Sequence, residues 1–389
     1  MSLSDTQRAA VLAACDATFT DALELSRRIH AQPELRFQEH QASAWLAEAL
    51  SAAGFALERP LGGLPTAFRA LVQRDSGAHV TLLAEYDALE GLGHACGHNL
   101  IAAMAAGAGL ALARVGGWSG ALSVTGCPAE EGGGGKVMLL EADAFSGVDA
   151  ALMIHPFADN VLAQPFLARA ALQVTFHGRA AHAAMAPFEG INALDAANLF
   201  FAGLNAFRQH VTPDVRLHGI IQHGGDAPNI IPSRTQLLVV ARAARGEYLF
   251  DHLLPRVRAI IEGAALMTGC RAEVTEPVPA YRDVRANPVL LEVFADASAS
   301  LGRVFVPEKP LESASTDLGN VSHALPTIHP YFSLGWDAQP HTPEFARAAI
   351  SPEGERCLRD GVRALALSAL RLLTDADLVR RAWAAQGST

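Results

Sequence analysis

The chain has 389 residues, of which 50% are apolar and 18% charged, so it is too apolar for an intrinsically disordered protein and longer than most single hydrophobic cores. We therefore expect two globular domains, or one domain that carries a large insertion. The formal net charge is −10, and Lys136 and Lys309 are the only lysines among 30 basic residues. This charge argues against a nucleic-acid partner, which needs a clustered positive surface.

The cysteines, the N-terminal residues and the apolar runs indicate the cellular compartment of the protein. Its five cysteines are widely spaced and form no CxxC pair, which favours a reducing compartment over a disulfide framework. The first residues lack the basic start of a signal peptide, so we expect a cytoplasmic protein. The longest apolar run, residues 100–113, is shorter than the roughly 20 residues of a membrane span. It predicts a closely packed buried helix and no membrane partner.

The first part of the chain predicts an α/β domain. Helical spacing of apolar residues over 16–31 and 38–53 precedes three units, from residue 78 onward, in which an apolar run ends in a polar cluster. Helical stretches at 100–115 and 136–141 follow the first two units, a βαβ rhythm that predicts a largely parallel sheet covered by helices. Ligands of such sheets bind beyond the carboxyl ends of the strands, where the polar clusters lie.

Residues 170–275 have a different pattern, which predicts an inserted domain. The order strand, helix (190–209), two strands, helix (247–267), strand is typical of a ferredoxin-like α+β sandwich. A proline-rich return linker follows, and helices and strands resume until a closing helix over 350–373. We therefore expect a catalytic domain formed by residues 1–165 and 280–389, interrupted by an inserted domain at 166–279.

The polar clusters contain side chains that bind metals. Cys96 and His98 lie in HACGHN, Glu130 and Glu131 lie in CPAEEGG, and His155 ends the third apolar run. Each has an ordinary explanation on its own, such as a buried cysteine, solvated carboxylates or a hydrogen-bonded histidine. Their occurrence at three successive strand ends instead predicts a site for a borderline-soft divalent metal. Asp87 could orient a ligating imidazole or could be a simple turn residue at a strand end.

Two other motifs compete with the metal site as explanations of these clusters. EGGGGKV resembles a phosphate-binding loop, but that motif would need glycine at Glu130 and a hydroxyl group at Val137, so nucleotide binding is excluded. A Cys96 nucleophile activated by His98 or His94 stays open as an alternative, although it leaves the glutamates and His155 without a role.

Seven sequence blocks resemble dinuclear metallopeptidase family twenty, the group of aminoacylases, aminobenzoyl-glutamate hydrolases and carboxypeptidases. The resemblance is to its amidohydrolase branch, whose metal motif is Cys-Gly-His. The matching blocks occur in order along the chain: RRIHAQPEL at 27–35, EYDALEGLGHACGHN at 85–99, PAEEGGGG at 128–135, GRAAHAAMAPFEGINALDA at 178–196, GGDAPNIIP at 224–232, STDLGNVS at 315–322 and HTPEF at 341–345.

The resemblance implies a role for each matching residue. Five residues would bind two divalent ions, Zn²⁺ or Mn²⁺ with Co²⁺ also possible, and the first of them would bridge the ions: Cys96, His98, Glu131, His155 and His341. His323 and His329 are also available as the last ligand, but HTPEF matches the family's final motif. Glu130 would be the general base. His182 would reach the active site from the inserted lid, often across a homodimer, and Asn229 and Arg242 would hold the substrate carboxylate.

The resemblance and the residues together predict a hydrolase. The expected reaction is metal-assisted cleavage of the amide bond of an N-acyl amino acid or a dipeptide-like substrate that carries a free carboxylate. Two alternatives are a cysteine-nucleophile amidase and a catalytically silent, metal-stabilised binding subunit of the same fold.

Overall fold

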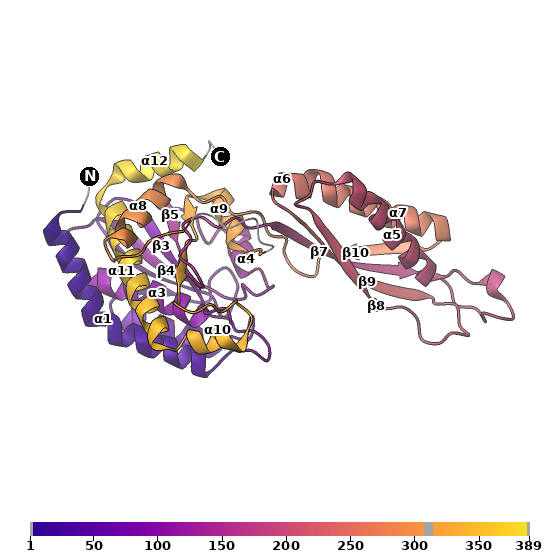
Figure 1. The fold of residues 1–389 in the computed structure, drawn as a ribbon, viewed down its shortest axis with the longest axis horizontal. Helices are drawn as coiled ribbons and strands as arrows, with labels where there is room; N and C mark the ends of the chain where they lie inside the picture. The colour runs from indigo at the N-terminus through magenta and orange to yellow at the C-terminus, as the bar shows by residue number, and fades with distance from the viewer. Residues whose placement is uncertain (1–2, 307–313, 387–389) are drawn as a thin grey trace. The chain divides into compact units, whose positions relative to one another are not determined.

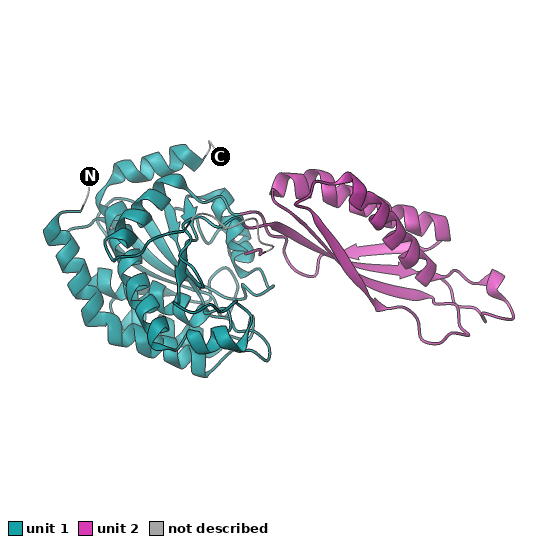
Figure 2. Ribbon diagram, in the orientation of Figure 1, with its two compact units in different colours: residues 1–165, 284–310, 317–389 teal, residues 166–283, 311–316 magenta. Residues whose placement is uncertain are grey.

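The computed structural model describes residues 3–306 and 314–386, and the chain divides into two compact units (Figures 1 and 2). Unit 1 comprises Met1–Pro165, Val284–Pro310 and Asp317–Thr389. Unit 2 comprises Phe166–Asp283 and Leu311–Thr316. Most of unit 2 is therefore one continuous stretch between two parts of unit 1, as in an inserted domain.

Unit 1 is built on a six-stranded sheet in the order β1-β2-β4-β3-β5-β11. Its strands are β1 (Ala56–Glu58), β2 (Phe68–Arg74), β4 (Gly120–Cys127), β3 (His79–Glu85), β5 (Ala150–Leu152) and β11 (Thr327–Ile328). Strands β4, β3, β5 and β11 pair in parallel, whereas β1 and β2 join antiparallel at one edge. The predicted α/β class is confirmed. The sheet is mixed, and its parallel part contains β3 and β4, the strands that the polar clusters with Cys96, His98, Glu130 and Glu131 follow.

Helices cover both faces of this sheet (Figure 1). In β3, Val80, Leu82 and Ala84 pack into the larger core, while Leu83 packs into a smaller core on the opposite face, as the two-residue period of a strand requires. The larger core includes residues of α1 (Asp5–Ala31), α2 (His40–Ala52), α3 (His98–Arg114), α8 (Pro288–Ala299), α10 (Pro343–Ala348), α11 (Pro352–Thr374) and α12 (Ala376–Gln386). The smaller core includes residues of α4 (Gly135–Glu141) and α9 (Leu318–Ala324).

Two of these helices differ from the sequence-based expectation. Helix α1 begins at Asp5 because Ser4 and Gln7 form a reciprocal capping box that stabilises an earlier start. Helix α12, which packs on α8 and α11, was not predicted. The predicted buried helix at 100–113 is confirmed as part of α3, in which every residue from His98 to Leu112 is buried.

The third apolar run forms two strands and not one. Strand β5 ends at Leu152, and β6 (His155–Phe157) pairs in parallel with β12 (Tyr331–Ser333) in a separate two-stranded sheet. The segment that pairs with these two strands is interrupted at the same level, between β11, which ends at Ile328, and β12, which begins at Tyr331. Pro330 lies in this interruption and has no N–H group to donate to a sheet hydrogen bond. His155 therefore begins a strand, and the expectation that it ends one was wrong.

Unit 2 is an antiparallel sheet covered by helices on one face (Figure 1). Its strands, in spatial order, are β10 (Arg271–Thr275), β7 (Ala168–His177), β9 (Arg234–Ala243) and β8 (Arg216–His223). The main helices are α5 (Ala193–Phe207) and α7 (Leu254–Thr268), the latter preceded by α6 (Gly246–Tyr248) and a π-helical turn, Leu249–Leu253. The β-α-β-β-α-β order confirms the predicted split βαβ pattern.

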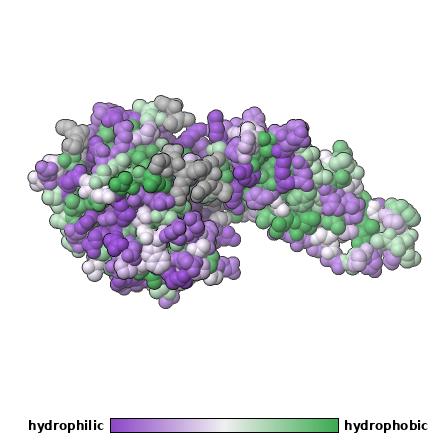
Figure 3. Space-filling model, in the orientation of Figure 1, coloured by the Kyte–Doolittle hydropathy of each residue, from purple (hydrophilic) through white to green (hydrophobic). Residues whose placement is uncertain are grey.

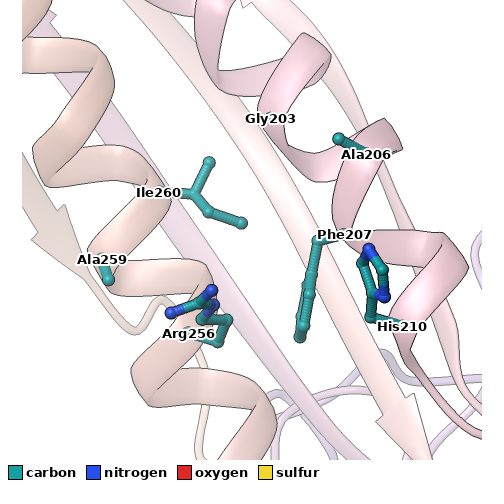
Figure 4. Close-up of a pocket in the computed structure, with 7 residues that line it drawn as sticks. All are labelled: Gly203, Ala206, Phe207, His210, Arg256, Ala259 and Ile260. Carbon is teal, nitrogen blue, oxygen red and sulfur yellow. The ribbon is translucent and has the colours of Figure 1, made fainter.

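A cavity of about 300 Å³ lies between the two main helices of unit 2 (Figure 4). Phe207 and His210 face Arg256 and Ile260 across it. One arginine, one histidine and small or apolar residues line the cavity, so it lacks the carboxylate and thiol groups of the predicted metal site.

No helix in the described part of the chain is long and apolar enough to cross a membrane.

We predict that Gly107→Ala destabilises unit 1 by about 1–3 kcal/mol, because overpacking a tight core forces its neighbours apart. A Cβ at Gly107 of α3 would lie 2.8 Å from Val362 Cγ2 of α11 and 2.9 Å from Ala22 Cβ of α1. All four tryptophans belong to unit 1, so their fluorescence during urea unfolding reports this unit.

The matched control is Gly116→Ala, an exposed position just beyond α3 at which an added Cβ meets no atom within 4 Å. Equal unfolding midpoints for the two variants would contradict the close packing of α3 against α1 and α11.

Candidate metal centre

A glycine between Cys96 and His98 allows both side chains to enter one site. Gly97 is the N-cap of α3 and has a left-handed backbone, with φ of 76°. A Cβ at Gly97 would lie 2.5 Å from Pro156 Cγ, so any other residue would push the chain away from His155. The sequence Cys-Gly-His therefore places the thiol at the end of a loop and the imidazole in the first turn of a buried helix.

Cys96, His98 and His155 form an inner triad of buried donor atoms, which lie within 4.8 Å of one another. The Sγ atom of Cys96 is 3.4 Å from His155 Nε2. His155 Nδ1 is 2.7 Å from the carbonyl oxygen of Pro156, and His98 Nδ1 is 2.9 Å from that of Asp87. A carbonyl can only accept, so each Nδ1 atom donates its proton and each Nε2 atom is left as the nitrogen that can bind a metal ion. Burial would lower the pKa of His98, but the carboxylate of Asp87, and secondly Cys96, hold it well above its usual value, so metal binding there displaces a proton.

Cys96, Glu131 and His341 form an outer triad that shares the thiol with the inner one. His341 Nε2 lies 3.3 Å from Glu131 Oε1, and the His341 side chain is half-exposed, unlike those of the inner triad. The backbone N–H of His341 donates to the carbonyl oxygen of Ala95 at 2.8 Å, which ties the C-terminal segment to the Cys96 loop. His329 instead lies behind His155, with a ring-centroid distance of 5.5 Å. The structure thus brings together the five residues proposed as ligands.

Three buried carboxylates hold the loop that carries Glu130 and Glu131. Each accepts a hydrogen bond of 2.8 Å from a backbone N–H group of the loop or of the first turn of α4 that follows it, and the pairs are Glu39 with Ala129, Asp87 with Glu131, and Asp317 with Lys136. Ala129 has φ of 59°, a conformation that a residue with a Cβ adopts only under such constraint. Asp87 also lies 3.0 Å from His98 Nδ1, so one carboxylate orients both an imidazole and the glutamate loop.

Burial and charge set the protonation of the site. Burial, and secondly the charge of Glu131, raise the pKa of the Cys96 thiol well above its usual value. Burial, followed by Glu85 and Glu131, likewise raises the pKa of Glu130 well above its usual value. Burial lowers the pKa of His155 to about 4, which keeps this imidazole neutral. Without a nearby cation, Cys96 is therefore a thiol and not a nucleophilic thiolate.

Sequence reasoning missed a buried ion-pair network next to these donors. Lys136 Nζ lies 2.5 Å from Glu85 Oε1 and 2.6 Å from Asp317 Oδ1, and all three side chains are buried. Glu85 Oε2 is in turn 3.5 Å from His98 Nε2. The available signal was a lysine directly after the glycine run in a chain with 28 arginines and two lysines.

In unit 2, the structure brings His182 and Asn229 together but not Arg242. Ala183 donates its backbone N–H to the carbonyl oxygen of Asn229 at 2.9 Å, and His182 and Asn229 both lie at the surface. His182 Nδ1 accepts the N–H groups of Ala184 and Met185, which leaves Nε2 as its outward nitrogen. The loops that carry His182 and Asn229 adjoin the end of β9 that begins at Arg234. Arg242 lies eight residues further along this strand, which corresponds to roughly 27 Å at about 3.4 Å per residue.

Arg242 lies near the other end of that sheet. It pairs in register with Arg169 of β7, three residues after the start of unit 2, and donates from Nη1 to Ser315 Oγ at 3.2 Å. Arg242 and the pair of His182 and Asn229 therefore cannot contact one substrate within a single unit 2.

The donor set fits two divalent cations. Within the described residues, His98 Nε2 is buried and makes no hydrogen bond, although carboxylate oxygens of Glu85, Glu130 and Glu131 lie 3.5 Å, 3.9 Å and 4.0 Å away. These distances are too long for good hydrogen bonds and leave space for a cation among the donors. One thiol, three imidazoles and one carboxylate suit a borderline-soft divalent metal. The division into two triads that share Cys96 matches a bridged pair of ions.

Comparisons with known proteins agree with this geometry. A family model described as peptidase dimerisation domain matches residues 169–266. The Xaa-Arg dipeptidase of Homo sapiens is 39% identical over 383 residues, covering 91% of this chain and 86% of that protein. One of the subunits of the p-aminobenzoyl-glutamate hydrolase of Escherichia coli K12 is 36% identical over 272 residues, covering 64% of this chain and 56% of that protein.

Solved structures share the fold. A Bacillus subtilis protein described as a dinuclear metal-binding peptidase from the M20 family superposes with a TM-score of 0.69 at 21% identity, covering 92% of this chain and 99% of that one. The aminobenzoyl-glutamate utilization protein of Klebsiella pneumoniae gives 0.73 at 20% identity, covering 91% and 96%. With a relative 39% identical over most of both chains, the protein belongs to the M20 family of peptidases and amidohydrolases.

Proposed function

We propose that this protein is a metal-dependent hydrolase that cleaves the amide bond of dipeptide-like substrates or N-acyl amino acids with a free carboxylate. The observation that carries the proposal is the pair of donor triads that share Cys96 beside the carboxylate of Glu130. The relatives named Xaa-Arg dipeptidase and aminobenzoyl-glutamate hydrolase support this substrate class.

The metal ions would be held by five ligands: Cys96, His98, Glu131, His155 and His341. Zn²⁺ and Mn²⁺ fit this donor set, and so does Co²⁺. Two such cations would polarise the scissile carbonyl and lower the pKa of a water. Asp87 would fix the tautomer and orientation of His98 through its hydrogen bond to Nδ1.

Glu130 would move the proton. Its carboxylate lies 3.9 Å from His98 Nε2 and next to the ligand Glu131, so it borders the position of the attacking water. It would accept the water's proton and pass it to the departing amine. Burial strengthens this role because a carboxylate in a site of low dielectric is a stronger base than one in water.

Unit 1 would be the catalytic domain and unit 2 a lid that forms a homodimer. Strand β8 is an edge of the unit 2 sheet, and Ile220 and Ile221 on it are 59% and 41% exposed. Apolar patches are visible on the surface of unit 2 in Figure 3. An unpaired edge with exposed isoleucines favours pairing with a second copy, and the matched dimerisation-domain family supports the same conclusion.

A homodimer would explain how Arg242 and the distant pair of His182 and Asn229 could act on the same substrate. Arg242 would hold the substrate carboxylate in its own subunit, while His182 and Asn229 would reach the site of the partner. His182 Nε2 would then donate to the developing oxyanion. All five cysteines are free thiols, which supports a cytoplasmic location.

The alternatives receive less support. A cysteine-nucleophile amidase would need a thiolate, whereas burial and Glu131 raise the pKa of Cys96. A silent binding subunit has no need of Glu130, which lies beside the proposed ligands His98 and Glu131.

A hydrolysis panel tests the function. We expect release of the amine from at least one of four substrate types, namely Xaa-Arg dipeptides, aminobenzoyl-glutamate, N-acetyl amino acids and N-benzoyl amino acids. Amides without a carboxylate should fail. A strong chelator should abolish the activity, and Zn²⁺, Mn²⁺ or Co²⁺ should restore it, because the ligands act through the ions. Activity that survives the chelator but is lost on thiol alkylation would identify the cysteine nucleophile instead.

The neighbouring glutamates should separate base from ligand. Glu130→Gln should retain both metals and lower kcat roughly a hundredfold to ten-thousandfold, because an amide cannot accept the proton. Glu131→Gln should lose metal as well as activity, because it removes a donor of the outer triad. Elemental analysis beside kcat measures both effects, and the reverse pattern would exchange the two assignments.

Mixing of variant subunits tests the role of His182. His182→Ala should lower kcat roughly a hundredfold to a thousandfold, as the loss of an oxyanion donor does, with little change in KM. Mixing His182→Ala with Glu130→Gln should restore part of the activity, because one site of each mixed dimer regains both groups. His210→Ala, another surface histidine of unit 2, serves as control. Absence of complementation in dimers that exchange subunits would refute action in trans.

A further inference from the structure

The buried ion-pair network of Lys136, Glu85 and Asp317 lies directly behind the metal donors. Lys136 is fully buried at the start of α4, and its Nζ contacts a carboxylate oxygen on each side, 2.5 Å and 2.6 Å away. Glu85 ends β3, and Asp317 precedes α9. The network therefore links three separate elements of unit 1 at one ammonium group.

The carboxylates around Lys136 resemble a cation site. Oxygen atoms of Glu85, Glu130 and Asp317 all lie within 4.8 Å of one another. Burial alone would lower the pKa of Lys136, but the charges of Asp317 and Glu85 hold it well above its usual value. The ammonium group thus supplies a permanent positive charge among these carboxylates.

A lysine suits this position better than the arginine that the chain uses almost everywhere else. An ammonium group is a compact point charge, whereas a guanidinium is a planar fork that needs more space. The Lys136 side chain is fully buried, so a larger guanidinium would have to displace its packed neighbours.

Lys136 acts on the metal donors through Glu85. The His98 ring lies between two carboxylates, Asp87 at Nδ1 and Glu85 at Nε2, with distances of 3.0 Å and 3.5 Å. The Nδ1 contact orients the ring, but Nε2 must keep its lone pair for a metal. Lys136 Nζ binds one carboxylate oxygen of Glu85, Oε1, while the other oxygen, Oε2, faces His98 Nε2. Lys136 therefore restrains the carboxylate that lies next to this nitrogen.

Lys136 also acts on the glutamate loop through Asp317. One oxygen of Asp317 binds Lys136 Nζ, and the other accepts the Lys136 backbone N–H at 2.8 Å. The end of the glycine run that follows Glu130 and Glu131 is therefore fixed to α9 by two contacts of the same residue.

We propose that Lys136 is a positioning residue of the reaction, whose buried ammonium fixes Glu85 against His98 and Asp317 against the glutamate loop. The inference rests on the proposed function, because it assigns Lys136 a role toward the metal ligands and the base. Lys136 belongs to neither donor triad. It sets where His98 and Glu130 stand.

Cobalt substitution tests the proposal with a readout that does not require turnover. The protein is stripped of metal, titrated with Co²⁺ and followed by its visible spectrum, which reports the coordination geometry. Lys136→Met keeps the length of the side chain but removes the charge. We expect its Co²⁺ affinity to fall about 10–100-fold, as it does when a residue that orients a ligand is lost. We also expect an altered spectrum and a lower kcat at nearly constant KM.

Glu85→Gln gives the same answer if Lys136→Met fails to fold, since removal of one partner of a buried pair is strongly destabilising. Lys136 then still pairs with Asp317, while the new amide can donate to His98 Nε2 and compete with the metal. We expect weaker Co²⁺ binding in this variant as well.

Arg303→Met is the matched control. It removes a largely buried ion pair of the same unit, in which Arg303 Nε lies 2.9 Å from Asp360 Oδ2, and it should lower thermal stability without altering the cobalt spectrum. If the wild-type protein binds no stoichiometric Co²⁺, the proposed function fails. If it binds Co²⁺ and hydrolyses substrate, but Lys136→Met or Glu85→Gln matches Arg303→Met in spectrum and affinity, the role of Lys136 alone is refuted.

Discussion

The site depends on three backbone N–H groups, two in the loop that carries Glu130 and Glu131 and one in the first turn of the helix that follows it. Four consecutive glycines follow these residues, and a glycine run loses more conformational entropy on ordering than any other sequence. The three hydrogen bonds from Ala129, Glu131 and Lys136 to buried carboxylates oppose this loss. Because the acceptors belong to distant parts of unit 1, Glu130 and Glu131 are placed only when the whole unit is folded.

The same arrangement concentrates negative charge inside the protein. The carboxylates of Glu85, Asp87, Glu130 and Asp317 lie near a single ammonium group, that of Lys136, and Glu131 lies next to Glu130. Burial without compensation would cost several kcal/mol for each charge. Two divalent cations would supply the missing positive charge, so binding of metal and stability of the site are coupled.

The sequence predicts the elements whose signals are local. Cys96, His98 and the glutamate pair lie in polar clusters that follow apolar runs, and the pattern of unit 2 follows from the two periods of strand and helix. One of the two carboxylate partners of Lys136 is 181 residues away, and no local pattern marks Asp317 as its acceptor. The position of His155 at a strand start depends on Pro330 in another segment. The distance between Arg242 and His182 depends on the length and register of β9, which cannot be predicted from the composition of the strand.

Helix α3 has a consequence for mutational tolerance. It begins at His98, a proposed metal ligand, and its buried surface consists largely of alanine and glycine. Such residues can be exchanged almost only for larger ones, so substitutions here add volume instead of removing it. A leucine-rich helix can lose a methylene group and leave a cavity that neighbours partly fill, but a close-packed alanine surface has no comparable means of relaxation. Sequence variation in this protein should therefore be narrowest along a helix that, beyond its first turn, contributes no chemistry.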